Sequence, residues 1–192
     1  QKGNTHIPFT MGNLSLGYEL DSMSNIGASI GLTSFAMKND GHPMTTFSGG
    51  PYGTGFSYGN EMTMKNKNTS FNGSIDYQRF FNKARTSSLT LSYLFSTTPA
   101  ENTNLRVYDP LPAGVTIPLK DLYSEAKTRG TEHTVQVDYT TPIGKGQTLS
   151  TGLKFIARRN SSDSKFYDIV SGANVYNANN SVNYRNTQSI LA

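Results

Sequence analysis

The stretch GSIDYQRFFNKARTSSLTLSYLFSTT, from Gly73 to Thr98, carries the pattern that decides the fold. Apolar and aromatic side chains occupy every second position on both sides of a short polar break, and polar side chains fill the positions between them. The apolar series is Ile75 and Tyr77 before the break, and Leu89, Leu91, Tyr93 and Phe95 after it. A period of two is typical of a β-strand whose faces differ chemically. The stretch therefore predicts two antiparallel strands joined by a tight turn.

The same alternation recurs before and after this hairpin. It occupies residues 14–20, 26–32, 135–139 and 149–157, and a last strand begins near Asn183. Short polar breaks at 21–25, 82–88 and 141–147 alternate with long polar breaks at about 39–60, 98–130 and 160–182. No shift in composition marks a domain boundary, so we expect residues 1–192 to form a single segment. The pattern predicts an all-β fold, an antiparallel up-and-down meander of about seven strands.

Two sequence features indicate that the apolar face meets lipid rather than a protein core. Transmembrane barrels have tight turns on one side of the membrane and long loops on the other, whereas the crossovers of a sandwich scatter the loop lengths. Tyr18, Tyr77 and Tyr139 each lie on the apolar face just before a short turn, where a tyrosine ring bridges acyl chains and headgroups. The sequence thus favours a section of a larger transmembrane β-barrel. A soluble β-sandwich or adhesin-type cell-surface binding module, with its apolar faces packed together, remains the alternative.

Composition narrows the classes of function. The 192 residues include no Cys, which excludes thiol catalysis and cysteine metal sites. The formal charge is +4, and the basic residues, among them Arg129 and Arg159, are scattered along the sequence rather than gathered in a stripe that nucleic acid needs. The three histidines have no partner at ligand spacing, and no catalytic motif is present. We therefore expect no catalytic residue, no metal site, no cofactor, no nucleic-acid partner and no enzyme activity.

Two groups of residues are candidates for binding. The glycine-rich break at 49–55 is interleaved with aromatic side chains that can stack on sugar rings or peptides: Phe47, Tyr52, Phe56 and Tyr58. Packing between neighbouring loops is the competing explanation for these aromatics. Asp76 and Asp138 each precede a tyrosine of the apolar face and belong to the polar face. They either contact a plug inside the barrel or are ordinary solvated residues of its wall.

Two stretches carry a family resemblance: SIDYQRFFNKARTSSLTLSYLFSTTP at 74–99 and TEHTVQVDYTTPIGKGQTLSTGLKFIARRNSSDSKFY at 131–167. They resemble the outer-membrane β-barrel family of Bacteroidetes, which is similar to the barrel part of TonB-dependent receptors. In that family a strand ends in Asp-Tyr-x-x-Pro, as at 138–142 here, and a Lys-Gly turn follows, as at 145–146. The resemblance spans roughly residues 61–192.

The resemblance implies a location in the bacterial outer membrane and energy-driven nutrient uptake without bond chemistry. It also implies that this chain is a segment of a longer protein, because barrels of that family have a plug and more strands than this pattern provides. The partners expected are outer-membrane lipid, a plug domain and the remaining barrel strands of the longer chain. The loop aromatics predict one further partner, a carbohydrate or peptide ligand that the long extracellular loops capture.

Overall fold

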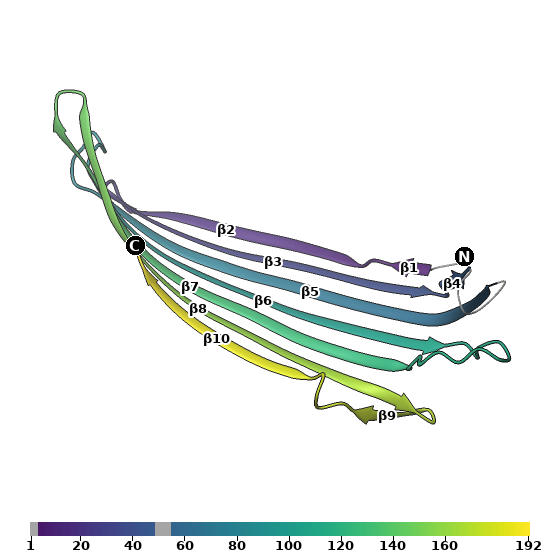
Figure 1. Ribbon diagram of the computed structural model, residues 1–192. Coiled ribbons are helices and arrows are strands. Elements are labelled where there is room, and N and C mark those ends of the chain that lie inside the picture. The colour runs from purple at the N-terminus through teal and green to yellow at the C-terminus, as the bar shows by residue number, and fades with distance from the viewer. Residues whose placement is uncertain (1–3, 49–54) are drawn as a thin grey trace.

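The computed structural model describes residues 4–48 and 55–192, which form one antiparallel sheet of ten strands (Figure 1). The strands are β1 (Asn4–His6), β2 (Phe9–Asp21), β3 (Ser24–Gly41), β4 (Met44–Phe47), β5 (Phe56–Phe80), β6 (Ser88–Tyr108), β7 (Leu122–Gly144), β8 (Gln147–Val170), β9 (Ala173–Tyr176) and β10 (Val182–Leu191). Each long strand pairs with the long strand that follows it in the chain. The prediction of an all-β antiparallel meander is confirmed.

The ten strands fill seven positions across the sheet, because two strands share a position in three places. β1 and β2 both pair with β3, β3 and β4 both pair with β5, and β9 and β10 both pair with β8. The count of about seven wall strands therefore agrees with the prediction. Within the described residues the first and last positions have no further neighbour, so the sheet is not closed.

The three short turns agree with the predicted positions. β2 and β3 are joined through Ser22 and Met23, β7 and β8 through Lys145 and Gly146, and β5 and β6 through residues 81–87. Gly146 has a φ of 74°, a left-handed conformation that glycine adopts without steric cost. All three turns lie at one end of the sheet, called the turn end below. The opposite end, where β4 and β9 lie, is called the loop end (Figure 1).

Asp21 ties the first turn to a neighbouring strand. Its carboxylate accepts hydrogen bonds from the backbone N–H of Met23 at 2.7 Å and from Arg79 Nη1 at 2.9 Å. These bonds, the one from Met23 foremost, hold the pKa of Asp21 below its usual range. Arg85, from the turn between β5 and β6, donates to the carbonyl of Ser22 at 3.0 Å. The adjacent turns are thus connected by side-chain hydrogen bonds.

The three long breaks are largely strand, and the prediction of long loops at 39–60, 98–130 and 160–182 is wrong in this respect. β5, β6, β7 and β8 are 25, 21, 23 and 24 residues long. The longest connection between described strands is the segment 109–121. Where water covers both faces of a strand, Asn, Thr, Ser and Lys replace the apolar alternation although the backbone ladder continues. The period-two signal therefore marks only the part of each strand nearest the turn end.

The apolar series lies on one face of the sheet, called the outer face below. Register places Tyr77, Leu91, Val137 and Leu153 side by side on four neighbouring strands. Leu91 is 41% exposed and Leu153 is 65% exposed. Among residues 4–48 and 55–192 no apolar side chain is buried. A sandwich would seal these side chains in a core, so the exposed single sheet has the form of a barrel wall and not of a sandwich.

The inner face carries small polar side chains that form hydrogen bonds across and along the strands. The hydroxyl oxygens of Ser29 and Ser74 are 2.8 Å apart, and Gln136 donates to the carboxylate of Asp138 at 2.7 Å. From Asn25 to Thr33 in β3 the outer-face residues are exposed and the inner-face residues are partly buried, in strict alternation. This difference is expected for a curved sheet whose polar face is concave, and Figure 1 shows the curvature.

The strands are much longer than a membrane crossing requires. At about 3.3 Å per residue, the 25 residues of β5 extend roughly 80 Å, whereas about ten residues cross a bilayer at the tilt of a barrel strand. The apolar series of the outer face, called the apolar band, runs from Phe71 to Tyr77 in β5 and from Leu149 to Phe155 in β8. The strands continue beyond it toward the loop end with mostly polar residues. Within the described parts of the chain, no helix combines the length and apolarity of a membrane span.

Aromatic side chains border the apolar band on both sides. Ile26 of β3 pairs with Tyr18 of β2 on one side and with Tyr77 of β5 on the other. The two tyrosines therefore lie in one row near the turn end, as the sequence predicted. On the other side the ring centroids of Phe95 are 6.2 Å from Phe71 and 5.1 Å from His133. The sequence analysis missed this second border, because its members become neighbours only through the register of β5, β6 and β7.

Candidate functional site

The aromatic candidates gather at the loop end of the sheet. Phe47 is the last residue of β4, and its direct partner in register is Phe56, the first residue of β5. Tyr58 follows two residues later on the same face of β5. Tyr108 ends β6 opposite Asn60, so its side chain shares that face as well. We name the four side chains Phe47, Phe56, Tyr58 and Tyr108 the distal aromatic cluster.

The rings of the distal aromatic cluster pack against one another. The centroids of Phe47 and Phe56 are 5.3 Å apart with planes at 16°, and those of Phe47 and Tyr58 are 6.1 Å apart at 18°. Tyr108 extends the cluster, with its centroid 5.9 Å from Tyr58 and the planes tilted by 55°. Such pairs stabilise their neighbours beyond the area they bury. Phe47 keeps 42% of its surface exposed, so the cluster presents an apolar patch to solvent.

The distal aromatic cluster lies on the inner face. β5 and β6 pair without a register shift from Asn60 to Phe80, so the even-numbered residues of β5 share one face along the whole strand. This series includes Tyr58 at the loop end and Ser74 and Asp76 near the turn end. The cluster is therefore in line with the polar surface that would form the inside of a barrel, at its loop-end mouth.

The structure brings together three of the four predicted binding residues, Phe47, Phe56 and Tyr58. Tyr52 lies outside the described residues. Tyr108 was missed, because only the pairing of β5 with β6 shows that it reaches the cluster. The ligand-binding role of these residues stays a prediction.

The predicted aspartates do not form a pair. Asp76 lies on β5 and Asp138 on β7, with β6 between them. Each accepts a hydrogen bond from a neighbour on its own strand, Asp76 from Ser74 at 3.3 Å and Asp138 from Gln136 at 2.7 Å. Both lie on the inner face, where the plug contact and the solvated-wall interpretation both remain open.

A contact between a histidine and an aspartate supports the cluster from the outer face. His42 Nε2 and Asp109 Oδ2 are 2.9 Å apart and cross over Gly59, where a Cβ atom would collide with both side chains. The backbone N–H of Asp109 also donates to the carbonyl of Gly59 at 3.0 Å. The pair is partly exposed, so it stabilises the fold only slightly. Its effect is to hold the residues after β3 and after β6 on either side of β5.

A second aromatic group occupies the outer face at the loop end. Tyr123, Tyr167 and Tyr176 are direct register partners on β7, β8 and β9, and adjacent ring centroids are 5.7 Å apart. Burial, followed by the charge of Glu125, raises the pKa of the Tyr123 hydroxyl above its usual range. The two faces of the loop end thus carry separate aromatic groups.

The distal aromatic cluster offers surface for contact rather than groups for bond chemistry. Its only side-chain polar atoms are the hydroxyls of Tyr58 and Tyr108, which donate or accept a hydrogen bond. Among residues 4–48 and 55–192, no three His, Asp or Glu side chains gather closely enough to hold a metal ion.

Comparison with known protein families gives a match over the larger part of the chain. Residues 79–192, from the end of β5 through β10, match the family described as "Outer membrane protein beta-barrel family". The match spans more than half of the chain and includes the long strands β6, β7 and β8. No curated protein matches the sequence.

Proposed function

The chain belongs to the outer membrane protein β-barrel family, and from this premise we propose that it takes part in nutrient uptake as a section of a TonB-dependent-receptor-like barrel of the kind found in Bacteroidetes. It lies in the bacterial outer membrane, and its apolar band contacts lipid. In this proposal the chain performs no bond chemistry. It contributes wall, interior surface and ligand contacts at the loop end.

The observation that supports uptake is the distal aromatic cluster on the inner face. Exposed aromatic rings at the mouth of a barrel interior are suited to contact with a ligand. In outer-membrane barrels the short turns face the periplasm and the loop side faces the exterior. A ligand arriving from outside therefore meets Phe47, Phe56 and Tyr58 before it reaches the polar interior.

The chemistry of the cluster fits a carbohydrate or peptide ligand. Aromatic rings stack on the C–H faces of sugars and on apolar or planar groups of peptides, and tyrosine adds a hydroxyl for hydrogen bonding. The patch carries no formal charge, so a strongly charged small ion is a poor match.

The inner face and the sheet edges indicate the further partners. Ser29, Ser74 and Gln136 present hydroxyl and amide groups to the interior, a surface suited to a polar plug domain or to water. The backbone groups at the two open edges need hydrogen-bond partners within hydrocarbon. In this proposal the barrel includes strands beyond the seven positions described, and a plug domain lies against the inner face.

Uptake measurements in cells test this proposal. The variant Phe56→Ala/Tyr58→Ala should take up a labelled oligosaccharide or a labelled peptide roughly tenfold more slowly at low concentration, because two stacking contacts are lost. Tyr167→Ala, which removes a ring from the outer face of the same end, is the matched control and should leave uptake unchanged. Surface labelling confirms that equal amounts of each variant reach the outer membrane. Wild-type uptake of both probes by the double variant would contradict the ligand role of the cluster.

A further inference from the structure

Three arginines lie on the outer face of β7, β8 and β10, immediately beyond the apolar band. Register aligns them in two adjacent rows, Arg129–Ser161–Arg185 and Thr131–Arg159–Thr187, the second row being nearer the band. We call Arg129, Arg159 and Arg185 the arginine triad. Each arginine thus has a hydroxyl side chain beside it on the next strand.

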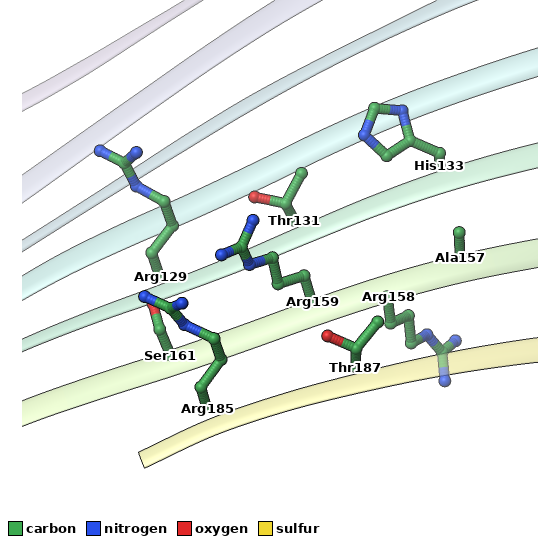
Figure 2. Close-up of a pocket in the computed structure, with 9 residues that line it drawn as sticks. All are labelled: Arg129, Thr131, His133, Ala157, Arg158, Arg159, Ser161, Arg185 and Thr187. Atoms are coloured by element: carbon green, nitrogen blue, oxygen red, sulfur yellow. The ribbon is translucent and has the colours of Figure 1, made fainter. Parts of the chain in front are cut away.

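The arginine triad borders a shallow groove of about 520 Å³ on the outer face. Figure 2 shows the Arg159 side chain extending along its strand, away from the side on which His133 lies, while the Arg129 and Arg185 side chains extend across the strands, roughly parallel to each other. Arg158, the neighbour of Arg159 in the sequence, belongs to the inner face, where its Nε pairs with Glu132. The two adjacent arginine side chains therefore lie on opposite faces of β8, although Arg158 also contributes to the lining of the groove.

The charges of the arginine triad are not neutralised within the described sheet. None of its members forms a hydrogen bond or an ion pair with a side chain of residues 4–48 or 55–192. The nearest acid on the outer face of β8 is Asp163, one row further from the band, and Lys165 lies 3.7 Å from its carboxylate. Three unpaired guanidinium groups that converge on one groove form an anion site.

The depth of the triad corresponds to the headgroup region. In β8, Arg159 lies four residues beyond Phe155, about 13 Å along the strand and roughly 9 Å along the membrane normal at the tilt of a barrel. A charged side chain on the lipid face is costly at the midplane but nearly neutral near the interface. The Arg159 side chain, the one nearest the band, extends away from it, which agrees with snorkelling toward headgroups. The triad is on the loop side, which faces the outer leaflet.

We propose that the arginine triad binds the phosphate groups of an anionic outer-leaflet lipid. The planar fork of arginine matches phosphate oxygens with two parallel hydrogen bonds, and Ser161 supplies a hydroxyl between Arg129 and Arg185. These two arginines flank β8 and are separated by two strand spacings, about 10 Å, so their long side chains can enclose one or two phosphates. Basic pockets at the membrane surface bind headgroups by this chemistry. The lipid, rather than a soluble anion, is the occupant because the groove opens toward the bilayer.

Lipid titration followed by native mass spectrometry tests this proposal. The full chain in neutral detergent is titrated with diphosphoryl lipid A, with the same lipid lacking its phosphates, and with free inorganic phosphate. We expect the triple variant R129Q/R159Q/R185Q to bind diphosphoryl lipid A at least about tenfold more weakly than the wild type. Lys154→Gln, on the inner face of β8 and outside the groove, is the matched control and should bind as the wild type does. The single variant Arg185→Gln, on the last strand, gives the same test if the triple variant does not fold, with a smaller expected loss of about threefold.

Three results would overturn the proposal. The first is undiminished binding of diphosphoryl lipid A by the triple variant or, if that does not fold, by Arg185→Gln. The second is equal wild-type affinity for the lipid without phosphates. The third is inorganic phosphate binding at the triad as tightly as the lipid, which would make the groove a site for soluble anions. The uptake proposal is independent of all three results.

Discussion

Replacing Leu91 by arginine tests the assignment of the outer face to lipid. Leu91 lies in β6 between Tyr77 of β5 and Val137 of β7, with Leu153 of β8 in the same row. It is 41% exposed in the sheet, and in the membrane this surface is covered by acyl chains. The substitution Leu91→Arg would place a guanidinium group among them.

The position of Leu91 in the apolar band determines how much folding free energy the substitution Leu91→Arg should cost. The band in β6 runs from Leu89 to Phe95, so Leu91 lies about one residue from its centre. One residue corresponds to roughly 3 Å along a strand, and less along the membrane normal. An arginine this close to the midplane costs about 2–4 kcal/mol of folding free energy. Ser92→Arg, at the adjacent residue on the inner face beside Asp76, should cost much less because the side chain meets water and a carboxylate.

The free energy of unfolding from lipid vesicles measures this cost directly. Because the chain has no Trp, the transition is followed by far-UV circular dichroism as guanidinium chloride is increased. The wild type, Leu91→Arg and Ser92→Arg are compared in vesicles of the same composition. Equal losses for the two variants would refute the assignment of the faces, since a sheet covered by protein on both sides resists charge on both.

Two further predictions use the same assay. Gly152→Ala brings a Cβ atom against the carboxylate of Asp138 and within 2.9 Å of the carbonyl oxygen of Val137, so we expect a loss of about 1–3 kcal/mol. Gly12→Ala, where no atom lies within 4 Å of the new Cβ, should be neutral or slightly stabilising, and a larger loss there than at Gly152 would count against the packing argument. The lowered pKa of Asp21 means that its contribution to stability is complete above the unfolded value of about 3.9 and is lost as the pH falls through the folded value. The stability difference between wild type and Asp21→Asn should therefore shrink in acid, and a difference that does not change with pH would contradict this.

The sequence was sufficient to predict the hairpin at 73–98 and the other turn-end hairpins. In this part of the chain one face meets an apolar solvent and the other a polar one, so the pattern has a period of two. The turns at 21–25 and 141–147 contain Asp, Ser, Asn and Gly, whose backbone preferences identify turns without tertiary information.

The lengths of the strands were not predictable by the same argument. Segments such as 98–108 and 122–130 extend β6 and β7, yet their side chains meet water on both faces and show no alternation. They were interpreted as loops because polarity without periodicity usually indicates one. Only the backbone ladder reveals that they continue the sheet.

The binding candidates depend on register between residues that are distant in the sequence. Tyr108 joins Tyr58 only through the pairing of β5 with β6. The arginines that seemed scattered become one triad because β8 aligns Arg129 of β7 with Arg185 of β10. A periodic pattern identifies the face of a side chain, but only register identifies its neighbours on the adjoining strands.

The most direct test of the central claim is site-directed spin labelling of the reconstituted protein. The chain contains no Cys, so single cysteines can be introduced without background labelling. Labels at residues 75, 91 and 137 should be accessible to dissolved oxygen in the bilayer and shielded from a water-soluble nickel reagent, whereas labels at 74, 92 and 136 should show the reverse. Labels at residues 75, 91 and 137 that are shielded from both reagents would mean that protein, not lipid, covers the outer face.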